Sequence, residues 1–109
     1  MNPNDLAKEL ITAAERRASM YGMQLGHGAD ADIRQFARTG ASQMFAAHPT
    51  PEPPTQMVEE AKAAFERLID EMVLAASEIP GYQTAHPGTI GEETLARALS
   101  RLCPLFPIC

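Results

Sequence analysis

The sequence predicts an all-α protein, and three observations carry this prediction. The 109 residues include 18 alanines but only two valines, Val58 and Val73. Alanine is the strongest helix former, whereas valine favours strands. Apolar residues recur at steps of three and four along several segments, which is the period of an α-helix. Glycine and proline clusters separate these segments, so the chain divides into about four helices.

The first predicted helix spans residues 3–21. Asn2 precedes it as a capping residue, and Pro3 suits the first helical position, where the missing N–H is not needed. Gly22 fits its end, because glycine tolerates the left-handed conformation that commonly closes a helix. One stripe of this helix is mostly apolar and consists of Leu6, Leu10, Ala13, Ala14, Arg17, Met20 and Tyr21.

The second predicted helix spans residues 30–47. Asp30 and Asp32 lie in its first turn, where the helix dipole favours acidic side chains. Small residues dominate one face, which lets another helix approach closely. This face consists of Ile33, Ala37, Gly40, Ala41 and Met44. A proline-rich connector, residues 49–55, then leads to the next helix.

The third predicted helix spans residues 56–79 and has the most regular pattern in the chain. Its apolar residues alternate three and four apart for about three heptads, as in a coiled coil. We call these residues the seam of this helix: Val58, Ala61, Phe65, Leu68, Met72, Ala75 and Ile79. Ile69, Val73 and Ala76 widen this seam, so more than one neighbouring helix is expected to pack on it. Pro80 and Gly81 end the helix.

The fourth predicted helix spans residues 90–103. Thr89 and Glu92 stand three residues apart and predict a capping box at its start, and Pro104 ends it. The expected architecture is therefore a single domain, residues 1–109, in which about four helices form a bundle around the helix 56–79. An extended apolar tail follows the bundle.

The acidic residues are concentrated in one segment. Residues 49–79 hold seven acids and two bases, so the whole net charge of −5 comes from there. One interpretation is a solvated face with ordinary ion pairs to the basic residues of the other helices, Arg16, Arg17, Arg34, Arg38, Arg97 and Arg101. The other is an acidic docking face for a basic protein. The residues proposed for that face are Glu59, Glu60, Glu66, Asp70 and Glu71.

Several classes of chemistry have no motif in this sequence. No Cys-x-x-Cys or His-x₃-His spacing indicates a metal site, and no Gly-x-Ser-x-Gly turn indicates a hydrolase. We therefore expect no catalytic residue, no metal and no cofactor. The acidic balance disfavours a nucleic-acid partner, because phosphate contacts need a basic face. No signal peptide and no apolar stretch of about 18 residues is present, so a cytoplasmic protein of bacterial or phage type is expected.

The C-terminal tail is apolar and contains two prolines. Leu105, Phe106 and Ile108 are expected to fold back on the bundle, although an oligomer contact or insertion into a partner stays open. An extended chain between Cys103 and Cys109 spans roughly 19 Å, so only a sharp turn would bring the two residues within disulfide distance.

The function hypothesis follows by elimination. A small acidic protein without catalytic motifs is expected to bind a protein partner, and to neutralise or inhibit it as an immunity protein, an antitoxin or an anti-defence inhibitor does. The partner would carry a basic surface. A self-associating structural subunit is the alternative, which leaves monomer and homodimer open. A small enzyme or ligand-binding bundle is the third possibility.

Overall fold

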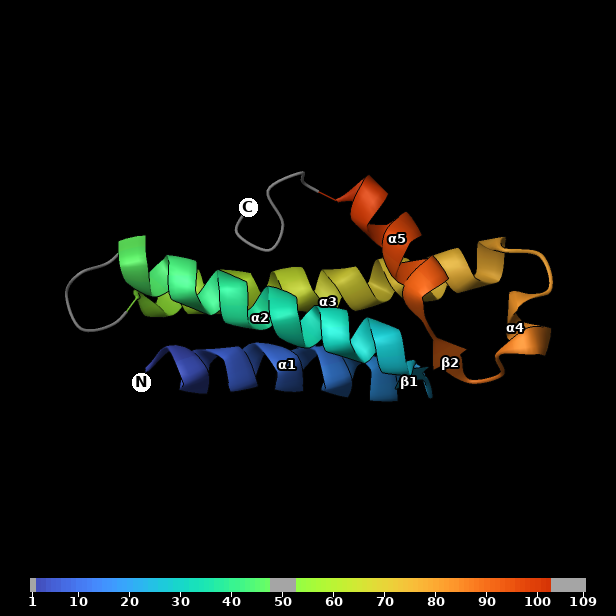
Figure 1. The fold of residues 1–109 in the computed structure, drawn as a ribbon, viewed down its shortest axis with the longest axis horizontal. Helices are drawn as coiled ribbons and strands as arrows, with labels where there is room; N and C mark the ends of the chain where they lie inside the picture. The colour runs from blue at the N-terminus through green and yellow to red at the C-terminus, as the bar shows by residue number, and fades with distance from the viewer. Residues whose placement is uncertain (1, 48–52, 103–109) are drawn as a thin grey trace.

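The structure is a computed structural model that describes residues 2–47 and 53–102, and it confirms the all-α fold (Figure 1). Within these residues the chain forms five helices and one pair of very short strands. Leu105, Phe106, Ile108, Cys103 and Cys109 lie outside the described residues. The elements in chain order are α1 (Pro3–Met20), β1 (Gln24–Leu25), α2 (His27–Ala47), α3 (Thr55–Glu78), α4 (Tyr82–Ala85), β2 (Thr89–Ile90) and α5 (Glu92–Arg101).

Both ends of α1 are closed by local hydrogen bonds. The Asn2 side chain accepts a bond of 2.9 Å from the Asp5 N–H, and the Asp5 carboxylate accepts one from the Asn2 N–H. At the other end Gly22 adopts a left-handed conformation with φ of 70°. The Gly22 and Met23 N–H groups then donate to the carbonyls of the last turn, which is a Schellman motif. The predicted cap at Asn2 and the predicted end near Gly22 are confirmed.

The long helix α3 is the central element, as predicted. Figure 1 shows α1 and α3 running side by side in the same direction, while α2 returns antiparallel to α1. The short helix α5 packs on the other flank of α3. Because α3 has α1 on one flank and α5 on the other, its apolar surface must be wider than a single coiled-coil seam.

The seam residues of α3 form the middle of the hydrophobic core. All are buried except Ile79, which is half-buried at the end of the helix. Ile69 and Ala76 are buried as well, and Val73 is half-buried against the core, so the predicted widening is confirmed. Phe65 is the largest side chain without exposed surface in the part of the chain that the structure describes. Burying a side chain of this kind contributes about 1.5–3 kcal/mol.

The predicted start of the fourth helix, at residue 90 after a Thr89 cap, is wrong. Thr89 and Ile90 form β2, which pairs in parallel with Gln24 and Leu25 of β1, and α5 begins only after Gly91. The expected capping box at Thr89 therefore does not form. The pairing joins residues more than sixty positions apart, and a local pattern carries no sign of such a partner. The second helix also begins earlier than predicted, at His27, directly after β1.

Two glycines let the β1 and β2 ends approach each other. A Cβ atom added to Gly26 would lie 3.2 Å from the Gly91 Cα and 3.4 Å from the Ile90 carbonyl oxygen. The buried Tyr82 of α4 reinforces the junction, because its hydroxyl accepts a bond of 2.7 Å from the Gly91 N–H. The β1–β2 pair thus ties the start of α2 to the start of α5.

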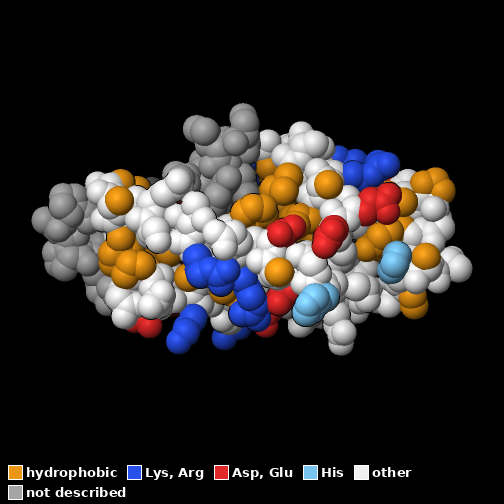
Figure 2. All heavy atoms as spheres, in the orientation of Figure 1, with side chains coloured by type: hydrophobic (Ala, Val, Ile, Leu, Met, Phe, Trp, Pro, Cys, Tyr) orange, Lys and Arg blue, Asp and Glu red, His pale blue; other side chains and the backbone are white. Residues whose placement is uncertain are grey.

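Figure 2 shows one face of the molecule, on which α2 and α5 lie in front. Hydrophobic side chains gather in the gap between these two helices, and basic side chains group over α2 and α1. Acidic and basic side chains both occur on this face.

Candidate functional site

The predicted docking residue Asp70 forms a close ion pair inside the molecule. Arg17 of α1 donates from Nε to Asp70 Oδ1 over 2.7 Å and from Nη2 to Oδ2 over 3.0 Å. The Tyr21 hydroxyl donates to the same Oδ1 over 2.8 Å. Such two-point contacts between guanidinium and carboxylate are among the stronger ion pairs in proteins. The carboxylate is thus held by α1 and not presented to solvent as an unpaired charge.

This pairing also changes the acid–base behaviour of the three groups. The hydrogen bond from Arg17 is the main cause that lowers the pKa of Asp70, and the Tyr21 bond acts in the same direction against partial burial. Because the Tyr21 hydroxyl donates to a carboxylate, the pKa of Tyr21 is raised. The Arg17 pKa is raised as well, so the pair stays ionised throughout the neutral range.

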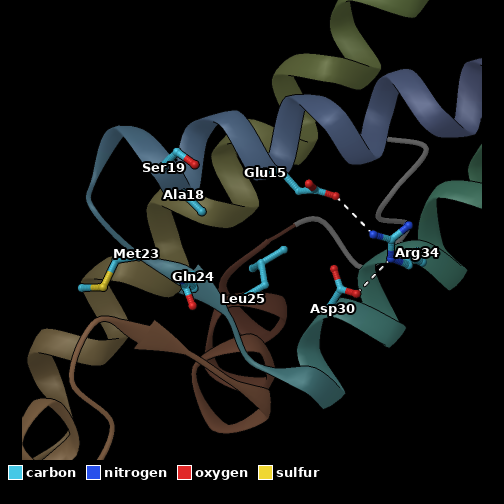
Figure 3. A pocket seen from close by; sticks show the side chains of 8 residues that line it. All are labelled: Glu15, Ala18, Ser19, Met23, Gln24, Leu25, Asp30 and Arg34. Carbon is cyan, nitrogen blue, oxygen red and sulfur yellow. Dashed lines mark hydrogen bonds and ion pairs between the residues drawn. The ribbon is translucent and has the colours of Figure 1, made fainter.

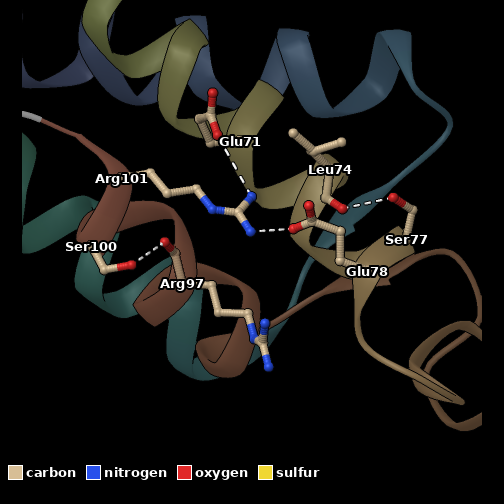
Figure 4. Close-up of polar contacts among 7 residues, drawn as sticks. All are labelled: Glu71, Leu74, Ser77, Glu78, Arg97, Ser100 and Arg101. Carbon is tan, nitrogen blue, oxygen red and sulfur yellow. Dashed lines mark hydrogen bonds and ion pairs between the residues drawn. The ribbon is translucent and has the colours of Figure 1, made fainter.

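Glu71 and Glu78 of α3 form ion pairs with Arg101 of α5 and are not unpaired charges in solvent (Figure 4). The Arg101 guanidinium lies between them, 3.8 Å from Glu71 through Nη1 and hydrogen-bonded to Glu78 through Nη2. Arg97 points away from both in Figure 4. The acidic flank formed by Glu71 and Glu78 therefore holds α5 on α3.

The other three predicted docking residues lie nearer the start of α3. Glu59 is 3.6 Å from the Lys62 ammonium, and Glu60 accepts a bond from the Gln56 amide. Glu66 makes no ion pair with any residue that the structure describes. The structure thus separates the predicted face: Asp70 and Glu71 belong to cross-helix pairs, whereas Glu59 and Glu66 border a groove between α1 and α3.

We call this feature the α1–α3 groove. It has a volume of about 430 Å³ and is lined by residues of both signs of charge. Its acids come from both helices, and so do its bases. The lining residues are Lys8, Glu9, Thr12, Ala13 and Arg16 of α1 and Glu59, Lys62 and Glu66 of α3.

The side chain of Glu9 is the most unusual group in the groove. Its Oε2 atom is shielded from solvent and has no hydrogen-bond partner among the described residues. A shielded carboxylate oxygen without a donor costs free energy, about 1–3 kcal/mol or more for a charged group. Lys8 and Arg16 line the same groove but form no ion pair within the part of the chain that the structure describes. The groove therefore holds a carboxylate oxygen that lacks a donor and, among the described residues, two cations that lack an ion-pair partner.

A second, smaller cavity lies between the end of α1, β1 and the start of α2 (Figure 3). It has a volume of about 250 Å³. Arg34 at its edge donates to Asp30 over 2.9 Å and to Glu15 over 3.3 Å, as the dashed lines in Figure 3 indicate. Its charged groups satisfy one another, so this cavity presents no unmet charge comparable to that of Glu9.

Clustered metal ligands and buried polar side chains are scarce among the described residues. Residues 2–47 and 53–102 contain no group of three or more His, Cys, Asp or Glu side chains arranged to hold a metal ion. Within the same ranges the buried side chains with a hydroxyl group are Tyr82, described above, and Thr94, whose hydroxyl donates to the Gly91 carbonyl. No described helix is both long and apolar enough to cross a membrane.

The α1 side of the groove was not predicted from the sequence. Lys8, Glu9 and Arg16 follow one another at steps that place them on the flank of α1 beside its apolar stripe. That pattern marks a surface flank but does not reveal which helix lies opposite. The parallel register of α1 and α3 supplies this information.

Comparison with known proteins adds no relative: no protein-family model, no curated protein and no solved structure matches this chain. The functional argument therefore starts from the geometry of the α1–α3 groove.

Proposed function

We propose that this chain is a non-catalytic protein that binds a protein partner with a basic surface, and thereby neutralises or inhibits it. The α1–α3 groove is the proposed binding site, with Glu9, Glu59 and Glu66 as its acidic residues. The observation that carries the proposal is the shielded Glu9 Oε2, which has no hydrogen-bond donor. If the Glu9 side chain turns outward into the groove, a Lys or Arg side chain of the partner supplies that donor.

The composition of the groove supports a protein partner rather than a small anion or cation. It combines three acids with three bases along two helices, so a ligand must match an alternating pattern of charge. A folded partner surface can do this, and complementary charge patterns give specificity and fast association. Asp70 and Glu71 are left out of the proposed site, because their ion pairs with Arg17 and Arg101 hold the fold together.

Affinity capture from the native cells tests the proposal. The groove variant combines Glu9→Gln, Glu59→Lys and Glu66→Lys. A matched control combines Glu93→Gln, Asp32→Lys and Glu60→Lys, which changes the net charge equally but leaves the groove intact. We expect the unaltered chain and the control to capture the same partner and the groove variant to lose it. Equal capture by all three proteins would reject the groove as the binding site.

A self-associating structural subunit is the second candidate function. Three large hydrophobic side chains of the described residues are exposed: Met20, Tyr21 and Leu74. Sedimentation at increasing protein concentration tests this candidate. A concentration-dependent dimer that is lost in Leu74→Ala supports it, whereas a strict monomer removes it.

A further inference from the structure

The strand β1 has one edge that β2 does not cover. Gln24 donates its N–H to the Gly88 carbonyl of the segment opposite over 2.8 Å. Gly26 donates in the same direction, to the Ile90 carbonyl, also over 2.8 Å. Successive residues of a strand direct their backbone groups to opposite sides. Leu25 lies between these two donors, so its N–H and C=O are directed away from β2. We call this side the free edge of β1.

The backbone groups of Leu25 are unpaired in the part of the chain that the structure describes. Neither its N–H nor its C=O has a hydrogen-bond partner there. The preceding Met23 differs, because its N–H donates to the Ala18 carbonyl over 2.9 Å. Leu25 is also half-buried, and backbone groups of folded proteins are almost always paired with protein or water. An unpaired strand edge is a template for another extended chain.

The cavity of about 250 Å³ lies beside the free edge of β1 (Figure 3). Both residues of β1 line this cavity, together with Met23, whereas neither residue of β2 does. Figure 3 shows the Leu25 side chain pointing toward the space between α1 and α2. The cavity therefore gives access to β1 from the side that β2 leaves open.

The lining of this cavity favours a neutral ligand. Its three charged side chains hydrogen-bond to one another, so they do not select a charged group. The rest of the lining consists of Ala18, Ser19, Met23, Gln24 and Leu25. A helix cannot pair with the free edge, because its own backbone groups are bonded within the helix. An extended chain with a small apolar side chain fits both the edge and the lining.

From this geometry we infer that the free edge of β1 binds an extended segment of a partner protein, which adds to the β1–β2 pair as a third strand. In an antiparallel arrangement, one residue of this segment exchanges both backbone hydrogen bonds with Leu25. Strand addition of this kind is a common mode of peptide recognition. The site lies on the flank of α1 that faces α2, whereas the α1–α3 groove lies on the other flank. The inference therefore goes beyond the proposed function and does not depend on it.

Two synthetic pentapeptides test the inference. Both consist of a valine flanked on each side by two threonines, which are residues that favour strands. The control peptide carries an N-methyl group on the valine and has no N–H there. We expect the unmodified peptide to shift the Leu25 amide resonance, to slow its hydrogen exchange, and to bind on the order of tenfold more tightly than the control. An unchanged Leu25 resonance at millimolar peptide, or equal binding of the two peptides, would overturn the inference.

A substitution at the rim of the cavity provides the second test. Ser19 is exposed and lines the cavity, so Ser19→Phe fills the site without entering the core. Ser77→Phe is the matched control, because Ser77 is an exposed serine of α3 away from the cavity. We expect Ser19→Phe to abolish the shift of the Leu25 resonance and Ser77→Phe to retain it, while circular dichroism shows that both variants are folded. Peptide binding that is unchanged in Ser19→Phe would reject the cavity as the site.

Two further outcomes assign the result. A dimer of the unaltered chain that Ser19→Phe abolishes would give the free edge to a second copy and overturn the inference. The residues Glu9, Glu59 and Glu66 take no part in these experiments. Failure of the inference therefore leaves the proposed function standing, and loss of the partner in the groove variant leaves the inference standing.

Discussion

Arg17 and Asp70 join α1 to α3 by two hydrogen bonds, of 2.7 Å and 3.0 Å. Fifty-three residues separate them in the chain, and each side chain is 32% exposed. The pair fixes the parallel register of the two helices that border the groove. An acidic residue that the sequence offers for partner binding thus has a structural role, and this distinction determines which substitutions test function and which test stability.

Asp70→Asn should destabilise the fold. The substitution removes the charge that Arg17 faces and weakens the Tyr21 bond, so we expect a loss of about 1–2 kcal/mol in the free energy of unfolding. Urea denaturation followed by circular dichroism measures it. Glu93→Gln is the control, because Glu93 is exposed and forms no ion pair with any described residue. If the two variants unfold at the same urea concentration, the Arg17–Asp70 pair does not stabilise the fold.

The stability difference between the unaltered chain and Asp70→Asn should depend on pH in the acid range. The pKa of Asp70 is lowered in the folded state, chiefly by Arg17. Its contribution is therefore fully present above the ordinary aspartate pKa of about 3.9 and is lost as the pH falls through the lowered value. Denaturation at a series of pH values should show the two proteins converging in acid. A difference that stays constant into strong acid would contradict this explanation.

Gly26→Ala should destabilise the protein, whereas Gly28→Ala should not. The Gly26 position faces backbone atoms of Gly91 and Ile90, which cannot move without separating β1 from β2. We expect a cost of about 1–3 kcal/mol. An added Cβ at Gly28 would lie closest to the carboxyl group and Cγ of the Glu92 side chain, which is exposed and can turn away by rotation about its own bonds. Alanine also favours the α2 helix by up to about 1 kcal/mol. Melting temperatures of the two variants compare them, and the reverse order would disprove the backbone contact.

Tyr82→Phe should loosen the junction between α4 and α5. The substitution leaves the Gly91 N–H without its acceptor, at a cost of about 1–2 kcal/mol. Tyr21→Phe is the matched control, because its hydroxyl is on the exposed side of the molecule and the Asp70 carboxylate keeps Arg17 as a donor. Hydrogen exchange of the Gly91 amide measures the effect locally. Unchanged protection of this amide in Tyr82→Phe would show that the hydroxyl does not hold the junction.

The features of the fold that depend on one segment alone could be predicted from the sequence. The seam of α3 depends on which residues recur every three or four positions, and this pattern belongs to one segment alone. The cap at Asn2 and the end at Gly22 are local in the same way. The β1–β2 pair could not be predicted, because two residues of each strand show no period, and Gln24 gives no sign of its partner Thr89.

The groove could be predicted only in part. Glu59 and Glu66 stand out in an acidic helix, whereas Glu9 and Arg16 of α1 are ordinary flank residues in a one-dimensional pattern. The sequence also offered Asp70 and Glu59 as equivalent acids. Their environments differ because Asp70 lies opposite Arg17, whereas Glu59 borders the groove. The register between α1 and α3 determines this difference.

The dissociation constant of the captured partner tests the central claim most directly. Calorimetry at low and high salt would compare the unaltered chain with the variant Glu9→Gln, Glu59→Lys, Glu66→Lys and with its charge-matched control. We predict that the groove variant binds at least about tenfold more weakly, with a smaller salt dependence, while the control binds as the unaltered chain does. Equal constants for the groove variant and the control would contradict the account.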